Sequence, residues 1–193
     1  MQEKKTMTSP IDYKVIMTFG VLLLSVNVGM TPSVSDVDDF NEGETEYLSL
    51  DYWGYHRLAS QIGWDKTEIV ANLIEHSKHP DLIKSLIAVE SSWYANARSN
   101  RSARGLMQIR NIAAIEIDPF VTESDLFDPI RNVEIGIEIF ERHMNYFDAY
   151  SATEHWALTS YNRGRYGTFA LGINPPETSY SRKVLELSTQ NRM

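Results

Sequence analysis

The stretch DLIKSLIAVESS occupies residues 81–92 and predicts a buried helix that ends in a single acid. Its apolar side chains recur at the three- and four-residue spacing of one helical face. The residues on this face are Leu82, Ile83, Leu86 and Ile87. Glu90 lies four residues beyond Leu86 and therefore projects from the same face. A carboxyl group against apolar surface loses hydration, which raises its pKa and suits a general acid. An isolated glutamate on a helix is nevertheless more often solvated or paired.

The sequence on both sides of this stretch predicts further helices and no long strand. The longest is opened by Asp128-Pro129 and runs through about Phe147, with an apolar stripe at helical spacing. The next is expected to begin with a capping box of Ser151 and Glu154 and to end at Gly164. The other expected helices are Trp53–Ile62, Lys66–Ser77 capped by Asp65, a short one near Leu106–Ile115, and Tyr180–Gln190. The pattern therefore predicts a mainly α domain.

Composition excludes several classes of protein. The 193 residues include 18 Lys and Arg, 26 Asp and Glu, and no Cys, for a net charge of −8. Without cysteine there is no disulfide scaffold, thiolate metal site or cysteine nucleophile. Residues 31–51 hold seven acids and no base, so the acidity belongs mainly to that segment. This overall acidity argues against a general nucleic-acid binder.

The first thirty residues resemble an export signal. A slightly basic start precedes Val15–Met30, a run of sixteen uncharged residues. That length exceeds a usual signal-peptide core and falls short of an upright membrane span. We therefore expect a signal peptide or membrane anchor over 1–30, an acidic linker over 31–51 and a folded domain over 52–193. In either case the domain would work outside the cytoplasm, in the periplasm or cell envelope, or anchored at the inner membrane.

Two further segments carry polar groups suited to a ligand. Gly105-Leu106-Met107-Gln108-Ile109 combines a glycine, apolar walls and an amide. Ser160-Tyr161-Asn162-Arg163-Gly164 places a phenol and an amide at a predicted helix end. Aromatic faces and amides are typical of sugar-binding sites. Taken alone, each segment is more often structural.

Together, these segments resemble the soluble lytic transglycosylase domain of family 1 type, which is related to goose-type lysozymes. The matching positions are Leu82–Ser91, Ala97, Ser99, Ala103, Gly105–Ile109, Asp128-Pro129, Asn132-Val133, Gly136, Tyr161-Asn162, Gly164, Glu177-Thr178 and Tyr180 through Val184. The resemblance covers about 110 residues, nearly all of the predicted folded part. It implies a mainly α, lysozyme-like fold and a lyase acting on peptidoglycan glycan strands without a cofactor.

The resemblance also implies roles for single residues. Glu90 would be the catalytic acid that cleaves the β-1,4 bond between N-acetylmuramic acid and N-acetylglucosamine. It would then act as a base while a 1,6-anhydro ring closes. The substrate-binding residues implied are Ser91, Met107, Gln108, Tyr161, Asn162 and Tyr180.

No acid occurs in Ser91–Arg104, where hydrolytic relatives often carry a second one. The later acids Glu116, Asp118, Glu123 and Asp125 are interpreted as a solvated loop. His76 and His79 lack a third ligand, so no metal site is predicted.

Several positions depart from the family pattern. Ser102-Ala103 replaces the usual Gly-Ala, Arg110-Asn111 the usual Met-Pro, and Arg163 the usual Ala. The spacing between Thr178 and Tyr180 is one residue short. The arginines near the first two motifs are Arg98, Arg101, Arg104 and Arg110. They are either ligands for the carboxylates of glycan-linked peptides or solvated surface.

Three alternatives remain open at this stage. A muramidase would deliver water to the same bond. A non-catalytic peptidoglycan-binding module would retain the cleft, although it has little reason to keep the acid. An accessory component of a phage particle or of a secretion or conjugation machine would open the wall locally.

Overall fold

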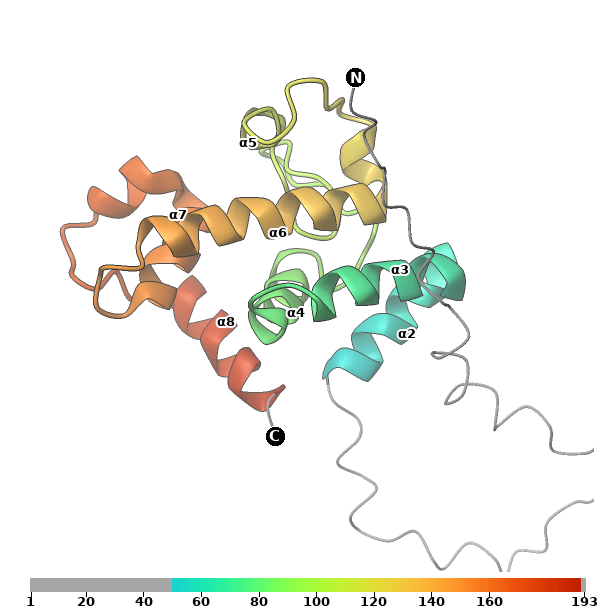
Figure 1. Ribbon diagram of the computed structural model, residues 1–193, viewed down its shortest axis with the longest axis horizontal. Helices are drawn as coiled ribbons and strands as arrows, with labels where there is room; N and C mark the ends of the chain where they lie inside the picture. The colour runs from blue at the N-terminus through green and yellow to red at the C-terminus, as the bar shows by residue number, and fades with distance from the viewer. Residues whose placement is uncertain (1–49, 192–193) are drawn as a thin grey trace, which may run out of the picture. The chain divides into compact units, whose positions relative to one another are not determined.

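The computed structural model describes residues 50–191, and helix α4 (Pro80–Glu90) is buried along most of its length. Helices α2 (Leu50–Ile62), α3 (Trp64–Glu75) and α8 (Ser179–Gln190) pack against α4 (Figure 1). Its buried residues include the four predicted apolar positions, Leu82, Ile83, Leu86 and Ile87. The buried helix predicted from residues 81–92 is therefore confirmed.

The long helix α6 (Pro129–Tyr146) crosses the molecule and packs against α3 and α7 (Thr153–Phe169). Asp128 caps it as predicted, since its carboxylate accepts hydrogen bonds from the backbone N–H groups of Ile130 and Arg131. A short helix α5 (Asn111–Ala114) and a 3₁₀ turn η3 (Asp125–Phe127) precede it. Within the described residues, β structure is limited to isolated bridges, so the mainly α prediction is confirmed.

Several predicted helix ends were wrong. Gly63, not Asp65, precedes α3, and Asp65 lies in its first turn. Ala152 precedes α7 with a φ of 55° and no side-chain cap, so Ser151 and Glu154 form no capping box. The short helix predicted near residues 106–115 shrinks to α5, because residues 105–108 form turns.

Gly164 interrupts α7, where the sequence places a helix end. Its φ of 74° lies in the left-handed region, which glycine adopts without steric cost. Helical turns resume after it and continue to Phe169. The site residues that precede Gly164 therefore lie in the segment of α7 before this interruption.

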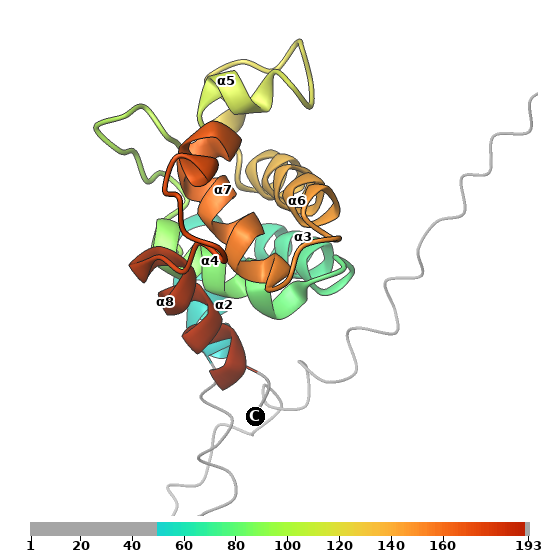
Figure 2. The same cartoon turned by 90° about the vertical axis from the view of Figure 1, so that its left-hand side faces the viewer.

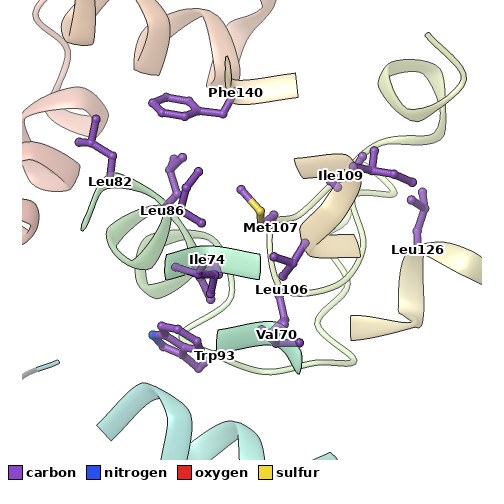
Figure 3. Close-up of a cluster of buried hydrophobic side chains, with 14 of the residues drawn as sticks. Val70, Ile74, Leu82, Leu86, Trp93, Leu106, Met107, Ile109, Leu126 and Phe140 are labelled. Atoms are coloured by element: carbon purple, nitrogen blue, oxygen red, sulfur yellow. The ribbon is translucent and has the colours of Figure 1, made fainter. Parts of the chain in front are cut away.

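The core is formed where α3, α4 and α6 meet the loop between α4 and α5. Figure 3 shows Met107 of this loop among Ile74 of α3, Leu86 of α4 and Phe140 of α6. All four side chains are fully buried. Ile69, expected on the buried face of α3, is 45% exposed instead. Packing of the loop into the core fixes the backbone on which several candidate site residues lie.

The export signal and acidic linker expected over 1–51 fall almost wholly outside the described residues. In the part that the structure describes, none of the helices has the length and apolar character needed to cross a membrane.

Candidate active site

Glu90 is the last residue of α4, and a tyrosine from the far end of the chain reaches it. The Tyr180 hydroxyl of α8 donates a hydrogen bond to Glu90 Oε1 at 2.5 Å. Glu90 is partly buried, and this burial raises its pKa, although the Tyr180 hydrogen bond acts in the opposite direction. Glu90 therefore has the environment of a carboxyl group that keeps its proton closer to neutral pH.

The chain turns sharply after Glu90. Ser91 is buried and closes α4, with Oγ donating to the Ile87 carbonyl at 3.1 Å. Ser92 and Trp93 follow with φ values of 51° and 63°, which non-glycine residues rarely adopt. The Trp93 ring is buried so closely against α2 that a Cβ at Gly54 would collide with it.

Gln61 of α2 holds the loop that follows Glu90. Its Nε2 donates to the Trp93 carbonyl at 2.9 Å, and its Oε1 accepts from the Ala95 N–H at 3.0 Å. One side-chain amide thus satisfies a backbone acceptor and a backbone donor of the same loop. The sequence analysis did not identify Gln61, because this partner lies more than thirty positions away.

Asn132 of α6 holds the second loop in the same way. This fully buried amide accepts from the Met107 N–H at 2.8 Å and donates to the carbonyls of Arg104 and Leu126 at 2.9 and 2.8 Å. Gly105 fits beside it with a φ of 74°, where a Cβ would collide with the amide. Asn132 was noted as part of the family motif, but its role as an anchor is visible only in the structure.

Met107 contributes its backbone to the site. Its side chain is fully buried in the core and does not line an accessible surface, contrary to the sequence-based expectation. Its carbonyl accepts a hydrogen bond from the Tyr161 hydroxyl at 2.8 Å. Gly136 of α6 lets the loop approach closely, since a Cβ there would collide with the Met107 side chain.

Gln108 and Asn162 differ in how firmly they are held. Gln108 has a φ of 49°, and its Nε2 donates to the carbonyls of Ala97 and Gly105 at 3.1 and 3.0 Å. Its amide therefore braces the loop. Asn162 is exposed on α7 and makes no side-chain hydrogen bond to any residue of the described part.

Both tyrosines near Glu90 remain protonated donors. Burial and the Glu90 charge raise the pKa of Tyr161 and of Tyr180 well above the ordinary value. The His143 ring packs edge-on against Tyr161. Burial, and to a smaller extent the Arg165 charge, lowers the pKa of His143 to about 4. His143 is therefore neutral at pH 7, and its Nδ1 lies 3.0 Å from the Ser160 hydroxyl.

The later acids lie in a largely solvated loop, as interpreted, with Glu116 and Glu123 exposed, and three of the four have partners away from Glu90. Glu123 forms an ion pair with Arg104 at 2.5 Å, and Asp118 forms one with Arg131 at 2.5 Å. Asp125 accepts from the Thr122 N–H and hydroxyl, both at 2.7 Å. Among the described residues, no second carboxylate contributes to the pKa shift of Glu90.

Residues 50–191 contain no cluster of three or more His, Cys, Asp or Glu that would hold a metal ion. His76 Nδ1 lies 2.8 Å from the Asn72 carbonyl, and the His79 ring packs edge-on against Phe140. A small surface pocket lined by Lys78–Leu82 adjoins the start of α4, at the opposite end of the helix from Glu90.

Comparisons with known proteins agree with this architecture. The transglycosylase SLT domain family matches residues 70–169. Among solved structures, the 70 kDa soluble lytic transglycosylase from Escherichia coli is similar, with a TM-score of 0.56 and 18% sequence identity. The match covers 74% of this chain and 28% of that protein, so it supports the lysozyme-like fold alone. No curated protein sequence matches the chain.

Proposed function

The chain belongs to the transglycosylase SLT domain family, and we propose that it is a peptidoglycan lytic transglycosylase in which Glu90 is the catalytic acid. The observation that carries the proposal is the environment of Glu90. Its carboxyl group is partly buried, has a raised pKa and accepts one hydrogen bond from a protonated tyrosine. These are the properties of a general acid.

In the proposed reaction, Glu90 gives its proton to the glycosidic oxygen while the bond from that oxygen to C1 of N-acetylmuramic acid breaks. The carboxylate then takes the proton of the C6 hydroxyl, and O6 forms the new bond to C1. The products are a free hydroxyl on N-acetylglucosamine and a 1,6-anhydro ring. Glu90 ends in its protonated form, and no water is consumed.

The scarcity of carboxylates near Glu90 favours this route over hydrolysis. A hydrolase of the usual kind needs a second carboxylate to activate water or to act as nucleophile. A second acid close to Glu90 would raise its pKa by charge repulsion, and no such contribution is present among the described residues. An internal nucleophile needs only one acid–base group.

The other site residues support Glu90 in this proposal. Tyr180 orients the carboxyl group through its hydrogen bond, and Tyr161 holds the Met107 carbonyl through another. Asn162 presents an exposed amide to the sugar, while Ser91 and Gln108 shape the two loops. No cofactor enters the reaction.

The proposed surroundings follow from the substrate. Peptidoglycan lies outside the cytoplasm, so we place the protein in the periplasm or cell envelope, exported or anchored through residues 1–30. Use within a phage particle or a secretion or conjugation assembly is consistent with the same chemistry.

The test is product identification after digestion of purified sacculi. We expect wild-type protein to release muropeptides with 1,6-anhydro ends, one water lighter than reducing ends by mass spectrometry. Glu90→Gln should lower the rate by at least about 100-fold, the usual minimum for a general acid. The matched control is Glu68→Gln, an exposed position on α3, which should retain wild-type rates. Reducing ends would support a muramidase instead, and binding without release would support a non-catalytic module.

A further inference from the structure

An acid-free stretch connects Glu90 to α5. Residues 91–115 contain four arginines and neither Asp nor Glu. The rest of the presumed folded part carries mixed charge, so this stretch is locally cationic. The structure separates the four arginines into one with a structural contact and three without.

Residues 97–105 form a small hairpin, here called the arginine hairpin. The Gly105 N–H donates to the Ala97 carbonyl at 2.9 Å, and the Ser99 N–H donates to the Ala103 carbonyl at 3.0 Å. Arg98 and Arg104 pair across it as an antiparallel bridge. Figure 2 shows the loop after α4 projecting from the body of the molecule.

Arg104 points inward and is not available to bind a ligand. Its side chain is 2% exposed, and its guanidinium group donates to the Ser102 carbonyl at 2.8 Å and pairs with Glu123. Arg104 therefore connects the hairpin to the segment before η3. Only the other three arginines remain candidates for binding a peptide.

The other three arginines are exposed at one place. Arg98 and Arg101 lie on the hairpin, and Arg110 follows Ile109, which is hydrogen bonded to Arg104 in both directions at 2.9 and 3.0 Å. Arg98 and Ile109 thus lie on opposite sides of Arg104. Within residues 50–191, the guanidinium groups of Arg98, Arg101 and Arg110 form no ion pair or hydrogen bond, although the Arg101 backbone N–H donates to Ser99 Oγ.

The base of the hairpin is held by a candidate site residue. Gln108 Nε2 donates to the carbonyls of both Ala97 and Gly105, the residues at which the hairpin begins and ends. The tip of the hairpin lies three residues beyond this base, which is about 10 Å in an extended chain. A group bound there would belong to the same substrate molecule as a sugar at Glu90, but to a part remote from the scissile bond.

We infer that Arg98, Arg101 and Arg110 bind the carboxylates of the peptide stems attached to the glycan, which rests on the proposed function. Guanidinium groups pair with carboxylates through two parallel hydrogen bonds, and three unpaired ones cluster beside the loops that carry the site. In a stem-bearing strand the lactyl carboxyl group of N-acetylmuramic acid is in amide linkage, so the carboxylates available to the arginines belong to the stems. These three arginines therefore select peptide-bearing strands over strands that carry no carboxylate.

The test measures binding separately from cleavage. Fluorescently labelled glycan fragments are titrated in three forms: with native stems, with stem carboxylates converted to amides, and as N-acetylglucosamine oligomers, which carry neither stems nor carboxylates. Arg98→Gln/Arg101→Gln/Arg110→Gln in the Glu90→Gln background should bind native stems about tenfold more weakly than Glu90→Gln alone, the sum of three exposed pairs. The two proteins should bind the other probes equally, and the difference should shrink in about 0.5 M salt.

The control variant is Lys66→Gln/Lys78→Gln/Lys183→Gln in the same Glu90→Gln background. It removes the same charge from exposed positions on or beside other helices and should bind native stems as tightly as Glu90→Gln alone. An equal loss on all three probes, or no loss on native stems, would overturn the inference. Unchanged melting temperatures exclude unfolding as the cause. If wild-type protein releases no anhydro products while the native-stem difference is present, the proposed chemistry fails and the arginine site stands.

Discussion

At the scale of single residues, the proposed mechanism depends on the carboxyl group of Glu90, on whose pKa burial and a hydrogen bond act in opposite directions. Burial favours its protonated form, whereas the Tyr180 hydroxyl stabilises its charged form. In the proposed mechanism Glu90 first donates and then accepts a proton, and the Tyr180 hydrogen bond opposes the larger effect of burial on its pKa.

The first prediction concerns Tyr180. Tyr180→Phe removes the hydrogen bond to the carboxylate, so the pKa of Glu90 should rise and the alkaline limb of the kcat/KM profile should move to higher pH. Rates measured on soluble glycan fragments from pH 4 to 9 would show this. Tyr166→Phe, at a position 94% exposed, is the control and should leave the profile unchanged. A uniform loss of rate without movement of the limb would mean that Tyr180 only packs the site.

The second prediction concerns stability. The folded-state pKa of Glu90 is raised, so the folded protein binds this proton more tightly than the unfolded chain does. The contribution of Glu90 to stability is therefore complete below the unfolded pKa near 4.5 and is lost as pH rises through the folded pKa. Glu90→Gln lacks this loss and should melt at a higher temperature than wild type at pH 7, with no difference at pH 4. A lower melting temperature at pH 7 would contradict the desolvation of Glu90.

At the scale of elements, two amides on helices hold the two loops that flank the site. Gln61 of α2 binds the loop after Glu90, and Asn132 of α6 binds the loop that carries Met107 and Gln108. Both loops contain residues with positive φ, so they need partners that compensate for the backbone conformation. The helices therefore position the site through side chains outside it.

The third prediction tests the Asn132 anchor. Asn132→Ala leaves two buried backbone groups, the Met107 N–H and the Leu126 carbonyl, without partners and should lower the free energy of unfolding by about 3 kcal/mol. Urea unfolding measures this directly. Asn145→Ala, at an exposed position of the same helix, should change stability by less than about 0.5 kcal/mol. A similar small effect at both positions would mean that the loop holds its shape without the amide.

Local patterns predicted the elements better than the contacts between them. The buried face of α4 and the Asp128 cap depend on residues within one turn, so the sequence suffices to find them. Asn132 instead binds residues 25 and 28 positions away, and Tyr180 binds an acid 90 positions away. The capping box of Thr178 and Ser181 at α8 was missed because its third position is Ser where Glu or Gln is usual.

At the scale of the whole molecule, the fold brings the end of α4 against the start of α8. The core that supports this contact draws on residues from Leu58 to Val184, so nearly every described element takes part in it. Family resemblance pointed to Glu90 as the proposed acid, while only the assembled fold distinguishes a buried Arg104 from an exposed Arg98.

The fourth prediction follows from that core. A fragment of residues 50–193 retains every member of the core and should unfold in one cooperative transition with the same midpoint as the full chain. Thermal melts followed by circular dichroism would measure both midpoints. A fragment that melts well below the full chain would show that residues 1–49 contribute to the stability of the domain.

The central claim is that Glu90 works without water as nucleophile, and isotope incorporation tests it most directly. Sacculi are digested by wild-type protein in H₂¹⁸O, and the new glycan ends are analysed by mass spectrometry. The proposed mechanism predicts 1,6-anhydro ends that carry no ¹⁸O. New ends that carry ¹⁸O at the reducing sugar would contradict it and identify the enzyme as a hydrolase.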